Sequence, residues 1–373
     1  MTDDHNEDQF CSEDERCEDA CNGFGCYLQP CTVILITVLI LLGNTVGIVA
    51  LATCKSLRDR HGYFLLSLAI SDLCTTFVSA TSIYPSIVRK WPFSHILCDV
   101  TAFLQGFLSE VSLTMIAGMS IERYIAVFYP LQIRRWLTNR RLLLAIMCSW
   151  VFLFAIKMFL FFNRYIQTEY DEDLYACLLD SSNGNLVILI ITYTVIEVPA
   201  FFTISYLSVR VIVHIWRRGR SRDRHRGNVM VSARRNPQWQ QTVTVLKVII
   251  IITLTFYLTW IPFIILRILY TSDEDTADQT KRQNDIPQWV EFISYWLLIS
   301  SSFINVFVYF FVHKKFRTHV KYLFKNLPSS CFKVFTARDG TTDIESSLAE
   351  EYQTQIVVPG TCLINDETVT TIL

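Results

Sequence analysis

Long apolar runs separated by short polar segments cover most of the chain. Residues 31–54 form an uncharged run of 24 residues, which as a helix rising 1.5 Å per residue would cross a bilayer core of ~30 Å. Six further runs lie near residues 62–87, 97–127, 141–162, 185–214, 241–270 and 287–312. These runs are apolar on nearly every side, whereas a buried helix of a soluble protein keeps a polar face. The pattern predicts an all-α membrane protein, a bundle of seven transmembrane helices.

Basic residues indicate how the bundle is oriented. Lysine and arginine are concentrated in the segments 55–60, 134–141 and 217–235, which follow the first, third and fifth runs and are therefore expected in the cytoplasm. Residues 1–30 instead contain nine acidic residues and one base, Arg16. We expect a multi-pass protein of the plasma membrane with an extracellular N-terminus and a cytoplasmic C-terminus. Residues 1–30 lack the apolar core of a cleavable signal peptide, so the first run is expected to direct insertion.

Four segments follow from this organisation. Residues 1–30 form an acidic, cysteine-rich extracellular tail, and residues 31–312 form the seven-helix bundle. Residues 313–326 alternate basic and apolar positions at helical spacing, which predicts an amphipathic helix on the inner leaflet in contact with membrane lipids. Residues 327–373 are rich in acids, Ser and Thr and are expected to be a disordered cytoplasmic tail. Its last residues, "TTIL", have the form that binds a PDZ domain.

Cysteines in the N-terminal tail indicate an oxidising exterior. Cys11, Cys17, Cys21 and Cys26 allow three disulfide pairings, among which the sequence does not choose. A zinc site is the alternative for the same four residues, although their spacing matches no familiar tetrahedral ligand pattern.

Polar residues inside the apolar runs and several short motifs occur together in a recognisable order. They are "GN" with Asn44, "LSLAISDL" with Asp72, "ERY" at 122–124, "FYLTWIP" at 256–262 and "NVFVY" at 305–309. In order and spacing, residues 31–326 resemble the rhodopsin-like (class A) G-protein-coupled receptors. The resemblance implies a receptor that transmits an extracellular ligand signal to heterotrimeric G proteins.

The resemblance also assigns roles to individual residues. It implies that G-protein coupling and the conformational switch involve Glu122, Arg123, Tyr124, Phe256, Trp260, Pro262, Asn305 and Tyr309, with Glu122 holding Arg123 at rest. It implies a disulfide between Cys98 and Cys177. It further implies an ion and water cluster of Asn44, Asp72, Ser112, Ser301 and Asn305, where oxygen ligands would bind a sodium ion at Asp72. A hydrogen-bonded hub without sodium is the alternative for this cluster.

A ligand pocket is also implied, above Trp260. Its members by resemblance are Gln105, Ser109, Thr192, Phe263, Arg267, Glu291 and Tyr295, with pairing to an outer-loop acid as the alternative for Arg267. Gln105 stands where amine receptors have an aspartate, and Ile299 stands where opsins have the retinal lysine. Neither a typical aminergic receptor nor an opsin is therefore expected. The acidic outer segments favour a cationic or peptide ligand, since they would concentrate cations at the mouth of the bundle.

Three charged residues lie within the apolar runs away from these motifs. They are Glu110, Lys157 and Glu197. Because an unpaired charge in the membrane is costly, we predict that Lys157 pairs with Glu110 or Glu197 across neighbouring helices. Proton uptake by a carboxylate is the alternative.

Three departures from the family pattern affect the expected level of signalling without ligand. Thr242 replaces the acidic residue that in many members pairs with the arginine of the third helix. Val306 stands where the seventh helix normally has proline, and Leu207 stands where the fifth normally has tyrosine. The first change lowers the cost of leaving the resting state, whereas the other two weaken the active state. We expect the first to dominate.

Other function classes are disfavoured. The chain has no phosphate-cradling glycine loop, no metal-spaced His/Cys cluster within the membrane and no nucleophile placed beside a base, so it is not expected to be an enzyme. The arginine-rich segment 217–235 adjoins the membrane, which favours contact with lipids and a G protein over binding of nucleic acid. The alternative function is a seven-helix transporter or channel, which would show internal repeats, and no matching halves are present.

Overall fold

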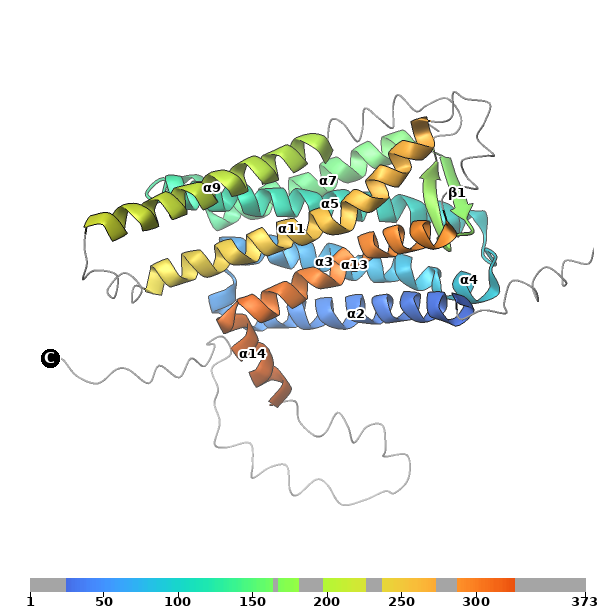
Figure 1. The fold of residues 1–373 in the computed structure, drawn as a ribbon, viewed down its shortest axis with the longest axis horizontal. Helices are drawn as coiled ribbons and strands as arrows, with labels where there is room; N and C mark the ends of the chain where they lie inside the picture. The colour runs from blue at the N-terminus through green and yellow to red at the C-terminus, as the bar shows by residue number, and fades with distance from the viewer. Residues whose placement is uncertain (1–24, 164–166, 181–196, 226–236, 273–286, 326–373) are drawn as a thin grey trace, which may run out of the picture.

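The computed structural model describes residues 25–163, 167–180, 197–225, 237–272 and 287–325. Its long helices lie side by side in one bundle, with a β-hairpin at one end (Figure 1). The elements are α2 (Gly25–Thr53), η1 (Lys55–Leu57), α3 (Arg60–Thr81), α4 (Ile83–Val88), α5 (His95–Phe128), α6 (Ile133–Trp136), α7 (Asn139–Phe162), β1 (Gln167–Asp171), β2 (Ala176–Asp180), α9 (Val198–His225), α11 (Pro237–Ser272), α13 (Gln288–Val312) and α14 (Lys314–Lys325).

The helices confirm the predicted seven-transmembrane bundle. Within the described ranges, six segments are long and apolar enough to cross a membrane, and Val198–His214 is a shorter apolar helix at the place of the fifth run. The first part of that run falls in residues 181–196, outside the described part of the chain.

The second predicted run is divided into two helices. α3 ends at Thr81, and α4 begins at Ile83 and contains Pro85. The ring of a proline clashes with the carbonyl four residues earlier, which here belongs to Thr81. The chain therefore interrupts the helix at Ser82, which caps α3 through its backbone N–H.

The first helix begins earlier than the sequence boundary suggested. α2 starts at Gly25 rather than at residue 31 and includes Pro30. Pro30 has no N–H and so cannot bond to the carbonyl four residues earlier. That carbonyl belongs to the first turn of α2, close to the helix end. This end of α2 therefore tolerates the proline.

α5 is the helix around which the bundle packs. It contacts α3, α7, α9 and α11, as well as both strands of the hairpin. Its approach to α3 depends on Gly118, where an added Cβ would lie 2.4 Å from Cε1 of Phe64. Because α5 contacts most of the other elements, a change at one of its ends can affect several helices at once.

A β-hairpin between α7 and α9 was not predicted. β1 and β2 are antiparallel, with Tyr170 opposite Cys177. In the turn, Oδ1 of Asp171 accepts hydrogen bonds from the backbone N–H groups of Asp173 and Leu174, both at 3.0 Å. Burial raises the pKa of the Asp171 carboxyl, and these two N–H donors oppose the rise. The acidic side chain that the sequence analysis counted as surface charge therefore also forms the turn.

α14 is the predicted amphipathic helix. Its apolar face buries Phe316 and Val320. His313, which separates α14 from α13, accepts a hydrogen bond on Nδ1 from the backbone N–H of Phe316 at 3.3 Å. Thr53 Oγ1 and His319 Nε2 lie 2.8 Å apart and join α14 to the end of α2. Contact of α14 with the inner leaflet remains a prediction.

Candidate functional site

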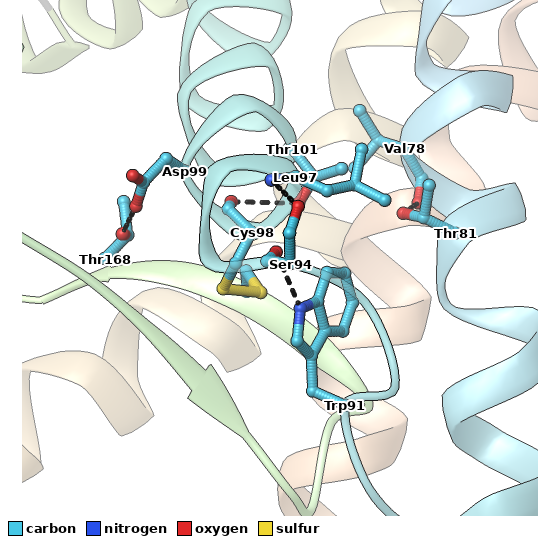
Figure 2. The surroundings of a disulfide bond; sticks show 10 residues. Val78, Thr81, Trp91, Ser94, Leu97, Cys98, Asp99, Thr101 and Thr168 are labelled. Carbon is cyan, nitrogen blue, oxygen red and sulfur yellow. Dashed lines mark hydrogen bonds between the residues drawn. A yellow bond between two sulfur atoms is a disulfide. The ribbon is translucent and has the colours of Figure 1, made fainter.

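The hairpin is attached to the outer end of α5 by a disulfide. Cys98 in the first turn of α5 bonds to Cys177 in β2, with a Cα–Cα distance of 5.3 Å. Figure 2 shows that Thr168 of β1 also donates a hydrogen bond to Asp99, next to the disulfide on α5. Both strands are therefore joined to the same helical turn. The Cys98–Cys177 pairing implied by the family resemblance is confirmed.

Further contacts fix the hairpin across the outer end of the bundle. The Trp296 indole N–H of α13 donates to the carbonyl of Leu174 at 3.2 Å, and Arg267 Nη2 of α11 donates to the carbonyl of Leu179 at 3.2 Å. The Tyr175 hydroxyl donates to Gln29 Oε1 of α2 at 2.9 Å. These hairpin residues are functional candidates that the sequence analysis missed. The acidic turn after residue 170 and the anchored Cys177 were the only signals for them.

The described members of the predicted pocket lie on three helices below this hairpin. On α5, Gln105 Nε2 donates to Ser109 Oγ at 3.2 Å. Phe263 of α11 and Tyr295 of α13 have ring centroids 5.7 Å apart. The two other members, Arg267 and Glu291, are half-buried on α11 and α13, and Thr192 falls outside the described residues. The structure therefore brings α5, α11 and α13 together with pocket residues on each.

Stacked aromatic rings lie deeper in the bundle. The rings of Phe256 and Trp260 on α11 stack at 4.5 Å, and Phe201 of α9 lies 5.4 Å from Phe256. The Tyr257 hydroxyl donates to the carbonyl of Phe201 at 2.8 Å. Pro262 lies within α11, two residues after Trp260. The contacts couple α9 to α11 at the level where the sequence placed the switch.

A buried ion pair joins α5 to α7. Lys157 Nζ lies 2.8 Å from Glu110 Oε1, and the side chains are only 5% and 1% exposed. The predicted pairing of Lys157 with Glu110 is confirmed. Glu197, the residue immediately before α9, is 7% exposed and close enough to both charges to interact with them electrostatically.

The polar cluster around Asp72 lies between α3, α5 and α13. Asp72 is 1% exposed and accepts hydrogen bonds from Asn305 Nδ2 at 3.0 Å and from Ser112 Oγ at 3.2 Å. Both of these donors are neutral. Among the described residues no basic side chain pairs with the Asp72 carboxylate, so the carboxyl and hydroxyl oxygens here suit a hard monovalent cation.

One assignment in this cluster needs correction. Asn44 Nδ2 donates to the carbonyl of Ser302 at 3.1 Å, and the Ser302 side chain, which is 8% exposed, lies beside Asp72. Among the described residues the Ser301 side chain, which is half-buried, forms no hydrogen bond. A shift of one residue turns a helix side chain by about 100°, so Ser302 rather than Ser301 faces the cluster.

The inner end of α5 carries the second ion pair. Arg123 Nε lies 2.8 Å from Glu122 Oε2, with 13% and 4% of the two side chains exposed. The Tyr124 ring lies 4.5 Å from that of Phe128. The structure thus places the acidic and basic members of the "ERY" motif in direct contact.

Two histidines and a tyrosine surround this pair. Tyr309 stacks on His313 at 4.7 Å and lies 6.3 Å from His61, and Arg123 acts electrostatically on all three rings. His313 lies just outside the membrane-spanning part of α13. Its pKa is lowered to about 4, mainly because the ring is buried. Both ring nitrogens of His61 are buried without a hydrogen bond.

Comparison with known proteins identifies this arrangement. Residues 43–309 match the family described as 7 transmembrane receptor (rhodopsin family). Probable G-protein coupled receptor 21 of Mus musculus is 26% identical over 325 residues, covering 85% of this chain and 89% of that protein. Neuromedin U receptor homolog nmur-2 of Caenorhabditis elegans is 28% identical over 333 residues, covering 82% and 80%. The crystal structure of squid rhodopsin aligns with a TM-score of 0.66 at 18% identity over 90% of this chain and 93% of that one, which shows a shared fold.

The chain belongs to the rhodopsin family of seven-transmembrane receptors. It is a class A G-protein-coupled receptor that signals through G proteins, and it is not an enzyme. The Cys98–Cys177 disulfide agrees with this membership. The family does not identify a ligand.

Proposed function

We propose that this chain is a plasma-membrane receptor that responds to a cationic extracellular ligand and activates heterotrimeric G proteins at its inner face. The N-terminus lies outside the cell and the C-terminus inside. The observation that carries the proposal is the contact between Glu122 and Arg123 at 2.8 Å at the inner end of α5. Because the two residues are sequence neighbours, they can separate without disrupting contacts between helices.

Transmission through the bundle follows the contacts described above. The hairpin rests on α11 through Arg267 and on α13 through Trp296. A ligand that displaces these contacts shifts α11, which carries the stacked Phe256 and Trp260 rings. Movement of α11 relative to α5 then frees Arg123 for the G protein. The ligand biases this change to the extent that it binds the moved state more tightly.

The experiment is expression in cells that carry reporters for each Gα class, first without ligand and then against a ligand library. Ligand-dependent output that is lost in Arg123→Ala at equal surface expression supports the proposal. A receptor that is silent in every reporter but passes current would favour the channel alternative.

The charge of the ligand is inferred from the acidic outer segments. Residues 1–30 carry a net charge of −8, residues 163–187 carry −4 and residues 271–287 carry −3. Such a field speeds the arrival of cations in a salt-dependent way. The association rate of a ligand found in the library screen should fall as salt is added. An association rate independent of salt would contradict this assignment.

The Asp72 cluster is assigned as an allosteric sodium site. Asp72, Ser112 and Ser302 supply oxygens from three helices, and the cation would balance a carboxylate that otherwise has only neutral donors. Replacing sodium by N-methylglucamine should raise basal output of the wild type and leave Asp72→Asn unchanged. Equal responses in both would favour the hydrogen-bonded hub without an ion.

The C-terminal residues are assigned to a PDZ partner. Thr371 stands two positions before Leu373, as strand addition to a PDZ groove requires. A pull-down with and without Leu373 tests this assignment, and binding that survives the deletion excludes it.

A further inference from the structure

Three charged groups lie together in the outer half of the bundle, and their charges do not cancel. Glu110 on α5 and Lys157 on α7 form the 2.8 Å ion pair, while Glu197, immediately before α9, is 7% exposed. Among the described residues Glu197 forms no ion pair of its own. With all three groups ionised the cluster has a net charge of −1. A buried carboxylate without its own counter-ion is costly, so this position is suited to a further cation.

Residues around the cluster indicate the shape of that cation. Phe201 follows Glu197 by four residues on α9, so the two side chains lie on the same helix face one turn apart. The Phe201 ring lies 5.4 Å from Phe256 and 6.4 Å from Trp260. A carboxylate one turn from a group of aromatic rings is complementary to a ligand that joins a positive charge to an aromatic ring through a short alkyl chain.

An unsatisfied acceptor on α5 gives independent support. Oε1 of Gln105 is buried and has no hydrogen-bond donor, although Nε2 of the same side chain donates to Ser109. A buried carbonyl oxygen normally receives a hydrogen bond, and an ammonium or guanidinium group supplies N–H donors. The hairpin covers this region, because Leu179 Cδ1 would lie 3.0 Å from a Cβ at Gly106, and Lys157 Nζ would lie 3.6 Å from it.

From these observations we infer that Glu197 is the counter-ion for an aryl-alkyl ammonium or guanidinium ligand, bound between α5 and α9 with its ring toward Phe201. The inference rests on the proposed cationic ligand and adds the residue and the chemistry that recognise it. Gln105 replaces the aspartate that binds amines in aminergic receptors, and here the negative charge is on α9 instead of α5. Glu110 and Lys157 neutralise each other and leave Glu197 as the charge available to the ligand.

The test uses the purified full-length receptor and two probes of almost equal shape, 2-phenylethylamine and the neutral 2-phenylethanol. The midpoint of thermal unfolding is measured at pH 7.4 at increasing probe concentration up to roughly 10 mM, since a ligand that binds only the folded state raises it. We expect the amine to stabilise the wild type and the alcohol not to. Glu197→Gln should weaken the response to the amine by about tenfold or more. Glu169→Gln, an exposed carboxylate on β1, is the matched control and should respond as the wild type.

Two further variants separate charge from structure. Glu110→Gln leaves Lys157 free to neutralise Glu197, so it should also weaken the amine response. The double variant Glu110→Gln/Lys157→Met restores a net charge of −1 at Glu197 and should recover the response. A purely structural role for the cluster predicts that the double variant binds no better than Glu110→Gln. This pair of variants tests the inference even if Glu197→Gln does not fold.

Three outcomes would overturn the inference. They are equal stabilisation by the amine and the alcohol, an unchanged amine response in a folded Glu197→Gln, and no response of the wild type to the amine. None of these measurements involves a G protein. A negative result in the binding test would therefore not contradict receptor signalling. A negative result in the reporter assay would not contradict ligand binding at Glu197, which the thermal measurements test separately.

Discussion

Two ion pairs within the described part of the chain have the same length, and we expect them to have different roles. Glu110–Lys157 and Glu122–Arg123 both measure 2.8 Å. The first connects two helices, and its side chains are 1% and 5% exposed; the second joins neighbours on one helix, and its arginine is 13% exposed. Breaking the first leaves a buried charge at a contact between helices, whereas breaking the second turns Arg123 toward the inner face and leaves the buried Glu122 on the same helix without its partner. The two pairs therefore differ in whether they connect two helices and in the exposure of the basic side chain, and not in length.

The largest effect is expected from removing the cation of the outer pair. Lys157→Met leaves Glu110 buried without its counter-ion and should destabilise the receptor by about 3–5 kcal/mol. Surface expression and the midpoint of thermal unfolding should both fall. Lys315→Met, at an exposed position on α14, is the control and should change neither. Unchanged expression and midpoint in Lys157→Met would show that the outer pair is no more structural than the inner one.

A smaller effect is expected from the covalent link in the outer half. Cys98→Ser opens a disulfide between residues 79 positions apart, a change that typically costs about 2–4 kcal/mol. The hairpin should loosen, while the inner pair on the same helix remains intact. Basal G-protein output per receptor at the surface should therefore stay unchanged although surface expression falls. Cys148→Ser, at an exposed free cysteine on α7, is the control. Loss of basal output per receptor would show that the two ends of α5 are not independent.

The inner pair should control basal signalling. Within the described residues Glu122 is the only acid in an ion pair with Arg123, and the position of the expected second acid is Thr242 on α11. A stabilisation of the resting state by ~1.4 kcal/mol changes its population ratio about tenfold. We therefore expect basal output that falls up to about tenfold in Thr242→Glu and disappears in Arg123→Ala. The measurement is a G-protein reporter normalised to surface expression.

Thr242→Gln is the matched control for this prediction, because it has the size of glutamate without its charge. It should leave basal output near the wild-type level. If well-expressed wild-type receptor gives no output above vector, the weakening of the active state expected from Val306 and Leu207 exceeds the effect of the missing acid.

The sequence predicted those features that depend on composition and helical spacing. The apolar runs located most of the helices to within a few residues, although α2 begins six residues before its run and α9 ends at His225, eleven residues after its run. The high cost of an isolated charge in the membrane predicted that Lys157 pairs with Glu110 or Glu197. The hairpin was missed because its turn depends on the Asp171 side chain, whose acidic neighbours looked like surface charge. Ser302 was missed because the family pattern indicates the level along the helix but not the direction of the side chain. Ser301 and Ser302 point about 100° apart around the helix axis, and only Ser302 points toward Asp72. The break at Ser82 was encoded by Pro85 and could have been predicted.

The smallest effect concerns the hinge between α13 and α14, on the inner side. His313 Nδ1 accepts the Phe316 N–H, so its ring is neutral with the proton on Nε2, and protonation of Nδ1 would remove this N-terminal cap of α14. Burial lowers the pKa of His313 to about 4 in the folded receptor, against a value near 6.5 in the unfolded chain. Because the unfolded state binds the proton first, the contribution of His313 is fully present above pH 6.5 and is lost as the pH falls toward 4.

When His313 is protonated, the short α14 can open locally while the bundle stays folded. We therefore expect protonation to destabilise α14 by about 1 kcal/mol. Hydrogen exchange in α14, corrected for the intrinsic pH dependence of exchange, should therefore become faster between pH 6.5 and pH 5 while α5 remains protected. His313→Asn keeps a side-chain acceptor for the Phe316 N–H but does not titrate in this range, so its α14 should be equally protected at both pH values. If α14 in His313→Asn opens as the wild type does, another group at the inner end controls the hinge. Acidification would then affect the inner half through the Arg123 pair or His61 instead of through the α14 cap.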